Sequence, residues 1–177
     1  MLQENEQILK KFRPELFQII QKALEQKEQT TEEKVELTVA RDGSSVVIVH
    51  KEGQDYRLNS AFRPIQEADR WAAQFEVDHL ENIAVLFGLG NGIFARSLMK
   101  RLGNRDKLIV YEPSLEIFRS VLLQEDISDL LKDPRMMFII EEVNPSDFYF
   151  VLERNLDWRN MDALSVCCHP GYQELFM

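Results

Sequence analysis

The chain has 177 residues and a mass of 20.8 kDa, and 45% of its residues are hydrophobic. This length fits one ordinary domain, or one domain with a small appendage, and the composition excludes collagen-like and wholly disordered chains. The 30 acidic residues outnumber the 21 basic ones, and the net charge of −9 is spread evenly over both halves. Because no cluster of Lys and Arg is present, we expect neither nucleic acid nor a membrane surface as a partner.

The two cysteines, Cys167 and Cys168, are neighbours, so their side chains point to opposite faces of a strand. This arrangement argues against a disulfide framework and a structural zinc site. The N-terminal residues are polar and helix-forming, without the apolar core of a signal peptide. No apolar run approaches the roughly 18 residues of a membrane span. We therefore expect a soluble, reduced, cytoplasmic protein.

Residues 1–60 are predicted to form a helical segment and a small β-meander. Apolar residues between positions 2 and 28 recur three or four apart, as on a helix, and Pro14 divides or kinks that helix. The polar stretch 26–34 is typical of a linker or an exposed turn. Three candidate strands follow, and Gly43 supplies the positive φ that the first hairpin requires. These strands are expected at 35–39, 46–49 and 54–58.

Residues 61–177 have the pattern of an α/β domain. Pro64 is suited to the first turn of a helix whose apolar face includes Trp71, and Trp158 is likewise expected in the core. Further strands are expected at 83–87, 108–111, 136–140 and 163–167, and helices at 93–102, 114–123, 128–131 and 146–156. This alternation predicts a Rossmann-like, methyltransferase-like and mainly parallel sheet with flanking helices.

The most informative motif is the glycine-rich stretch Gly88-Leu-Gly90-Asn91-Gly92, which joins an apolar strand to a helix. Glycines at alternate positions let the backbone turn sharply and approach a ligand, and the helix N-terminus offers free N–H groups. Ile93 occupies the place of the third glycine in the dinucleotide fingerprint G-x-G-x-x-G. The spacing is closer to the first motif of S-adenosylmethionine-dependent methyltransferases.

A carboxylate at the end of the next strand supports a nucleotide-like ligand. Glu112 lies 20 residues after Gly92, and an acid at about this spacing accepts hydrogen bonds from ribose hydroxyls in nucleotide-binding α/β folds. The alternative is that the glycines only permit tight packing and that Glu112 caps the helix beginning near Ser114. Both interpretations stay open, with S-adenosylmethionine, a CMP-sugar or another nucleotide as candidate ligands.

Further candidate ligand-binding residues follow the expected strands 136–140 and 163–167. Glu141 could bind an adenine amino group, although a solvated role is the alternative. The segment His169-Pro-Gly-Tyr172 distantly resembles the Asn-Pro-Pro-Tyr of amino-group methyltransferases, but His and Gly depart from that motif. A strand order of 3-2-1-4 would place this segment beside the glycines, at the topological switch point. There His169 could act as a general base, or it could simply cap the strand end beside a Pro-Gly turn.

The sequence lacks the residue patterns of metal sites, serine hydrolases and P-loop proteins. His50 and His79 have no metal-ligand spacing, so no metal site is expected. No serine lies in a G-x-S-x-G elbow, and no lysine follows a phosphate loop, which argues against hydrolase and P-loop chemistry.

Several motifs, taken in order, resemble the N-terminal domain of the motility-associated-factor (Maf) glycosyltransferases. The resemblance covers about residues 55–177. Its specificity lies in the order of the motifs, because each is short. The motifs are PIQEADRW at 64–71, VLFGLGNG at 85–92, VYEP at 110–113, LKDPR at 131–135 and HPGY at 169–172.

The resemblance implies a larger bacterial parent protein with a central domain similar to the archaeal pterin pyrophosphokinase MptE. Such a parent transfers a nonulosonic acid from a CMP-sugar to Ser or Thr hydroxyls of flagellin. The resemblance places catalysis mainly in the central domain, which is expected after Met177, so no catalytic residue carries over to this chain. It marks Gly88, Gly90, Gly92, Glu112 and the HPGY segment as family-type positions.

The strand pattern also predicts a partner. A complete methyltransferase sheet has more strands than the four expected here, so the edge beside the fourth strand is expected to be covered by another domain or subunit. Three functions stay open: a non-catalytic module of a Maf-type transferase, a methyltransferase-like domain, and a structural or docking module.

Overall fold

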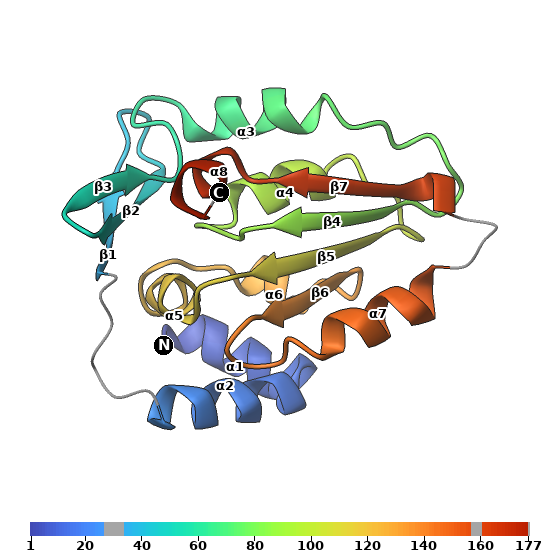
Figure 1. The fold of residues 1–177 in the computed structure, drawn as a ribbon, viewed down its shortest axis with the longest axis horizontal. Coiled ribbons are helices and arrows are strands. Elements are labelled where there is room, and N and C mark those ends of the chain that lie inside the picture. The colour runs from blue at the N-terminus through green and yellow to red at the C-terminus, as the bar shows by residue number, and fades with distance from the viewer. Residues whose placement is uncertain (27–33, 157–160, 177) are drawn as a thin grey trace.

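The structure is a computed structural model that describes residues 1–26, 34–156 and 161–176. It contains a four-stranded parallel sheet with flanking helices and a separate three-stranded antiparallel sheet (Figure 1). The Rossmann-like α/β fold expected from the sequence is therefore confirmed.

The parallel sheet has the order β6-β5-β4-β7, which is the 3-2-1-4 order that the sequence analysis took as a condition for placing the His169 segment beside the glycines. Its strands are β4 (Ile83–Phe87), β5 (Lys107–Glu112), β6 (Met136–Ile140) and β7 (Leu164–Cys168). β4, β5 and β6 are mostly buried apolar runs because helices cover both faces of the sheet there, whereas only Cys167 of β7 is buried. All four strands point toward the meander and α8 in Figure 1, so their carboxyl ends meet at one edge.

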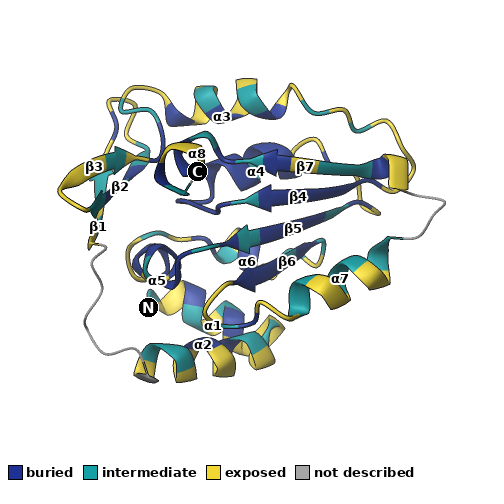
Figure 2. Ribbon diagram, in the orientation of Figure 1, coloured by how far each residue is buried: buried dark blue, intermediate teal, exposed yellow. Residues whose placement is uncertain are grey.

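Two buried clusters cover the two faces of this sheet. The larger one packs Leu86, Val110 and Phe138 against residues of α4 (Ile93–Met99), α5 (Leu115–Gln124) and α6 (Ser128–Lys132). The smaller one packs Val85, Ile109 and Ile139 against α7 (Asp147–Asn155). Figure 2 shows β4, β5 and β6 as mostly buried, whereas much of β7 is only partly buried.

Pro14 separates two helices, α1 (Gln3–Phe12) and α2 (Pro14–Gln26), as the sequence predicted. α1 packs on α6, and the buried amide of Asn5 ties α1 to the C-terminal end of α5 and to the residue that precedes α6. Asn5 Nδ2 donates to Leu122 O (3.2 Å) and Glu125 O (2.7 Å), and Asn5 Oδ1 accepts from Ile127 N–H (3.0 Å). Most of the predicted linker, residues 27–33, lies outside the described residues.

The meander consists of β1 (Lys34–Val39), β2 (Ser45–Lys51) and β3 (Gln54–Arg57), with β2 in the centre. Gly43 has φ +88° in the first hairpin turn, which confirms the predicted role of this glycine. Val47, Val49 and Leu58 belong to the same buried cluster as Leu86. The core is thus continuous across residue 60, where the sequence analysis divides the chain.

Two helices, α3 (Pro64–Ala72) and α8 (Pro170–Phe176), each begin with a proline. In α3, Trp71 is only half-buried, against Phe75 and Phe94, and the predicted core residue Trp158 lies outside the described residues. The Pro-Gly turn expected after the fourth strand is instead the start of α8. Proline suits the first helical turn, and Gly171 is required because a Cβ there would overlap the backbone of Leu58.

Candidate functional site

The glycine loop connects β4 to α4 at the carboxyl edge of the sheet. Gly88, Gly90 and Gly92 have φ of +91°, +54° and +82°, so the loop makes the sharp turn that this spacing indicates. The N–H of Gly88 donates to Tyr111 O (2.8 Å), and the N–H of Gly92 donates to Leu89 O (3.0 Å). The intervening amides of Leu89 and Gly90 are left to bind a ligand or a side chain.

The carboxylate of Glu112 accepts a hydrogen bond from the first of these amides, that of Leu89. The residue is 1% exposed, at the carboxyl end of β5, and its Oε2 accepts from Leu89 N–H (2.9 Å). Its Oε1 accepts from Ser114 N–H (3.0 Å), and Ser114 Oγ accepts from Ile117 N–H (3.2 Å) at the start of α5. One buried carboxylate therefore joins the glycine loop to the N-terminus of a helix.

Tyr172 of α8 binds both the carboxylate and the second amide. Its hydroxyl donates to Glu112 Oε2 (2.6 Å) and accepts from Gly90 N–H (3.0 Å), and the side chain is fully buried. A Cβ at Gly88 would overlap the Tyr172 ring, so the glycine gives room to this tyrosine. The phenol hydroxyl thus engages the acid that would receive a ribose hydroxyl in a nucleotide-binding fold.

His169 lies beneath the same loop and is fully buried. The backbone N–H of His169 donates to Phe87 O (3.0 Å). In the imidazole ring, Nδ1 accepts from Gly171 N–H (3.2 Å), so the ring proton lies on Nε2. The ring packs 4.0 Å from that of Phe94, centroid to centroid. Nε2 has no hydrogen-bond partner in the described part of the chain, and a Cβ at Gly90 would stand 3.0 Å from it.

This environment makes His169 a weak base. Burial lowers the pKa of His169 to about 3, so the imidazole is neutral near pH 7. A general base works best with a pKa near the operating pH and must reach the proton that it removes. In this conformation His169 meets neither condition. Its contacts are those of a histidine that caps a strand end, the alternative raised by the sequence.

Asn91 and Glu141 have different positions relative to this cluster. Asn91 is buried and ties the loop to the meander, because its Nδ2 donates to Ser45 O (2.7 Å) and Ser45 Oγ (3.0 Å). Glu141 is exposed just beyond β6, and its N–H donates to Glu112 O (3.0 Å). The structure therefore gathers the predicted residues around Tyr172, whereas the Glu141 side chain remains on the surface.

Sequence reasoning missed the contacts that hold α8 in place. The backbone of Leu58 passes so close to Gly171 that no side chain fits between them, and Phe94 packs on the His169 ring. Ser45 holds the loop through Asn91. Neither Leu58 nor Ser45 belongs to a motif. Leu58 takes part through its backbone, and Ser45 through its backbone carbonyl and its hydroxyl, so no local signal could have identified them.

Across residues 1–26, 34–156 and 161–176, no three His, Cys, Asp or Glu side chains are grouped to hold a metal. His50 contacts Asp55 (2.6 Å) and Glu36 (3.3 Å), and the hydrogen bond to Asp55 raises the pKa of His50. Burial raises the pKa of Cys167 to about 12, which keeps its thiol protonated.

Two further observations bear on function. None of the helices in the described residues is long and apolar enough to cross a membrane. Comparison with known protein families, curated proteins and solved structures gave no match. At the candidate site, the Tyr172 hydroxyl is bound to both the Gly90 amide and the Glu112 carboxylate.

Proposed function

We propose that the chain is a non-catalytic Rossmann-like module of a Maf-type protein glycosyltransferase that acts in the cytoplasm. The observation that carries the proposal is the Tyr172 hydroxyl bound between Glu112 and the amide of Gly90. Transfer of a nonulosonic acid from a CMP-sugar requires room for the nucleotide and a base for the acceptor hydroxyl. The loop is occupied, and the pKa of the buried His169, about 3, makes this residue too weak a base.

The outer edge of β7 supports a docking role. His169 N–H donates to Phe87 O, so in the parallel ladder the alternate residues Leu164, Val166 and Cys168 turn their backbone groups outward. No strand of the described chain pairs with this edge, and Val166 is 70% exposed. The strand Leu-Ser-Val-Cys-Cys also lacks the charges and proline that commonly block an edge.

The opposite edge of the sheet is protected. Side chains of Arg13 and Asn144 bond to the outward backbone groups of β6. This contrast favours β7 as the place where the downstream catalytic domain of the parent chain would continue the sheet. Contact with flagellin would then belong to the parent protein.

The proposal is tested by co-expressing the encoding gene with flagellin and a CMP-nonulosonic acid synthetase. We expect mass spectrometry to show flagellin carrying nonulosonic acid when the whole reading frame is expressed. Residues 1–177 alone should leave flagellin unmodified. Modification by residues 1–177 alone, or no modification by the whole reading frame, would contradict the proposal.

The methyltransferase alternative keeps one observation in its favour. The amides of Leu89 and Gly90 and the carboxylate of Glu112 converge at one place, as they would around a ribose. This function requires α8 to leave the loop, so that Tyr172 no longer occupies it. In that case S-adenosylmethionine should bind the chain, and Glu112→Ala should weaken binding sharply.

A further inference from the structure

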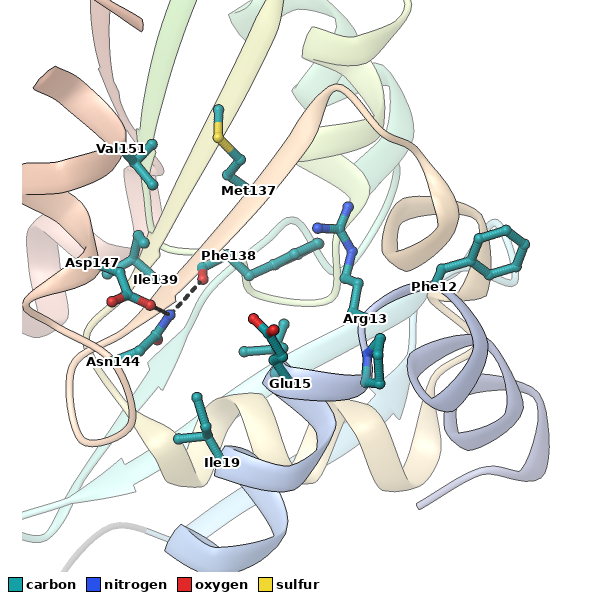
Figure 3. A pocket seen from close by; sticks show the side chains of 12 residues that line it. Phe12, Arg13, Glu15, Ile19, Met137, Phe138, Ile139, Asn144, Asp147 and Val151 are labelled. Carbon is teal, nitrogen blue, oxygen red and sulfur yellow. Dashed lines mark hydrogen bonds between the residues drawn. The ribbon is translucent and has the colours of Figure 1, made fainter. Parts of the chain in front are cut away.

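A second surface of the molecule has the shape of a binding groove. It lies between α2 and α7, over the outer edge of β6, with a volume of about 420 Å³ (Figure 3). Apolar side chains form much of its lining: Leu16, Ile19, Phe138, Ile139 and Val151. The volume is within the roughly 300–1,000 Å³ range of ligand sites. We call this feature the α2–α7 groove, and its role does not depend on the proposed function above.

A β-strand cannot readily add to the sheet in this groove, because the main-chain groups at the β6 edge are taken. Arg13 Nη2 donates to Met136 O (2.8 Å). Asn144 Nδ2 donates to Phe138 O (3.1 Å), while Asn144 Oδ1 accepts from Ile140 N–H (2.9 Å). An occupant must therefore bind mainly through its side chains.

The charges in the groove favour a cationic occupant. Glu15 of α2 and Asp147 of α7 stand on opposite walls in Figure 3. Glu15 is exposed and has no hydrogen bond or ion pair with the described residues, and Asp147 accepts a hydrogen bond from Asn144 (3.0 Å). The guanidinium of Arg13 is directed to main-chain carbonyls, including Leu131 O (2.6 Å). The carboxylates are thus left to pair with an incoming cation.

We propose that the α2–α7 groove binds a basic amphipathic helix of a partner protein. Apolar side chains of such a helix, spaced three and four residues apart, would pack on the groove floor. Its Lys or Arg side chains would meet Glu15 and Asp147. Phe12 and Ile19 line the groove and are exposed, so they offer apolar surface that a helix would cover. The net charge of −9 adds long-range attraction for a basic partner.

The test uses a fluorescent helical peptide with Leu on one face and Lys on the other, and a sister peptide in which Glu replaces each Lys. Binding to the intact chain is followed by fluorescence anisotropy. We expect Ile19→Asp and Glu15→Lys to weaken binding of the basic peptide at least tenfold. Matched changes elsewhere, Ile65→Asp in α3 and Glu4→Lys in α1, should leave it within twofold, and the acidic peptide should not bind.

The proposal is overturned if the basic peptide fails to bind, or if the matched changes weaken binding as much as the groove changes do. Equal binding of the acidic peptide would also overturn it. Sedimentation of the chain alone tests another occupant: self-association abolished by Ile19→Asp would assign the groove to a second copy. Glu15 and Ile19 are exposed, and circular dichroism confirms that each variant is folded before it is compared.

Discussion

At the residue scale, the Tyr172 hydroxyl makes the hydrogen bonds to Glu112 and to the Gly90 amide that the sequence led us to expect from a ligand. A ribose hydroxyl and a phenol hydroxyl can both donate to a carboxylate and accept from an amide. The motif around Gly90 and Glu112 is therefore compatible with either partner. The sequence predicted which residues gather there, but not that the hydroxyl of Tyr172 would reach Glu112 from 60 positions away.

Replacing Tyr172 by Phe removes this hydroxyl and leaves the ring. The buried carboxylate of Glu112 then loses a donor and the Gly90 amide loses an acceptor, so we expect a loss of about 2 kcal/mol in unfolding free energy. Urea unfolding at pH 7 measures the loss. Tyr56→Phe is the matched control, because the Tyr56 hydroxyl makes an exposed bond to Gln54. Equal losses in the two variants would show that the buried hydroxyl has no special role.

His169 makes stability depend on pH. Its pKa is about 3 in the folded chain and about 6.5 when unfolded, so between these values the unfolded state binds an extra proton. Stability is therefore lost as pH falls below 6.5, by about 2 kcal/mol at pH 5. We expect the wild-type chain to lose about this much more than His169→Gln between pH 7.5 and 5.

Urea unfolding of both chains at the two pH values checks this difference, with His79→Gln as the exposed control. An identical pH dependence of wild type and His169→Gln would mean that the imidazole is protonated alike in both states.

At the element scale, α8 closes on the glycine loop with no room for additional atoms. Gly88 meets the Tyr172 ring, and Gly171 meets the backbone of Leu58. The strand 83–87 was predicted with its observed bounds because a buried parallel strand is an apolar run between polar segments. α8 was missed because Pro-Gly is typical of a turn. Its helical state depends on packing against a distant backbone.

The packing of α8 on the glycine loop is tested by comparing the stability of Gly88→Ala with that of Gly43→Ala. The two glycines have nearly equal φ, +91° and +88°, so backbone strain of about 1 kcal/mol is common to both variants. A Cβ at Gly43 has no heavy atom within 4 Å, whereas a Cβ at Gly88 overlaps Tyr172. We expect Gly88→Ala to be about 2 kcal/mol more destabilising in urea unfolding. Similar losses would mean that α8 moves away at little cost.

At the scale of the whole molecule, the glycine loop and α8 lie against one continuous core that also includes residues of the meander. The meander holds the loop through Asn91 and Ser45, and Leu58 holds α8 through Gly171. The alternation of strands and helices predicted a mainly parallel sheet with flanking helices, because parallel strands need crossover connections. It could not predict the packing of the meander on α8. The resemblance to Maf-type transferases stays a prediction.

The most direct test of the account is calorimetric titration of the chain with S-adenosylmethionine, S-adenosylhomocysteine, CMP, a CMP-sugar and ATP. We expect no binding heat from any of them, because Tyr172 occupies the acid and the loop amide that a nucleotide would need. Saturable binding to the wild-type chain that is lost in both Gly90→Val and Glu112→Ala would contradict the account. Such binding would show that α8 moves away from the glycine loop and that a ligand takes the place of the Tyr172 hydroxyl.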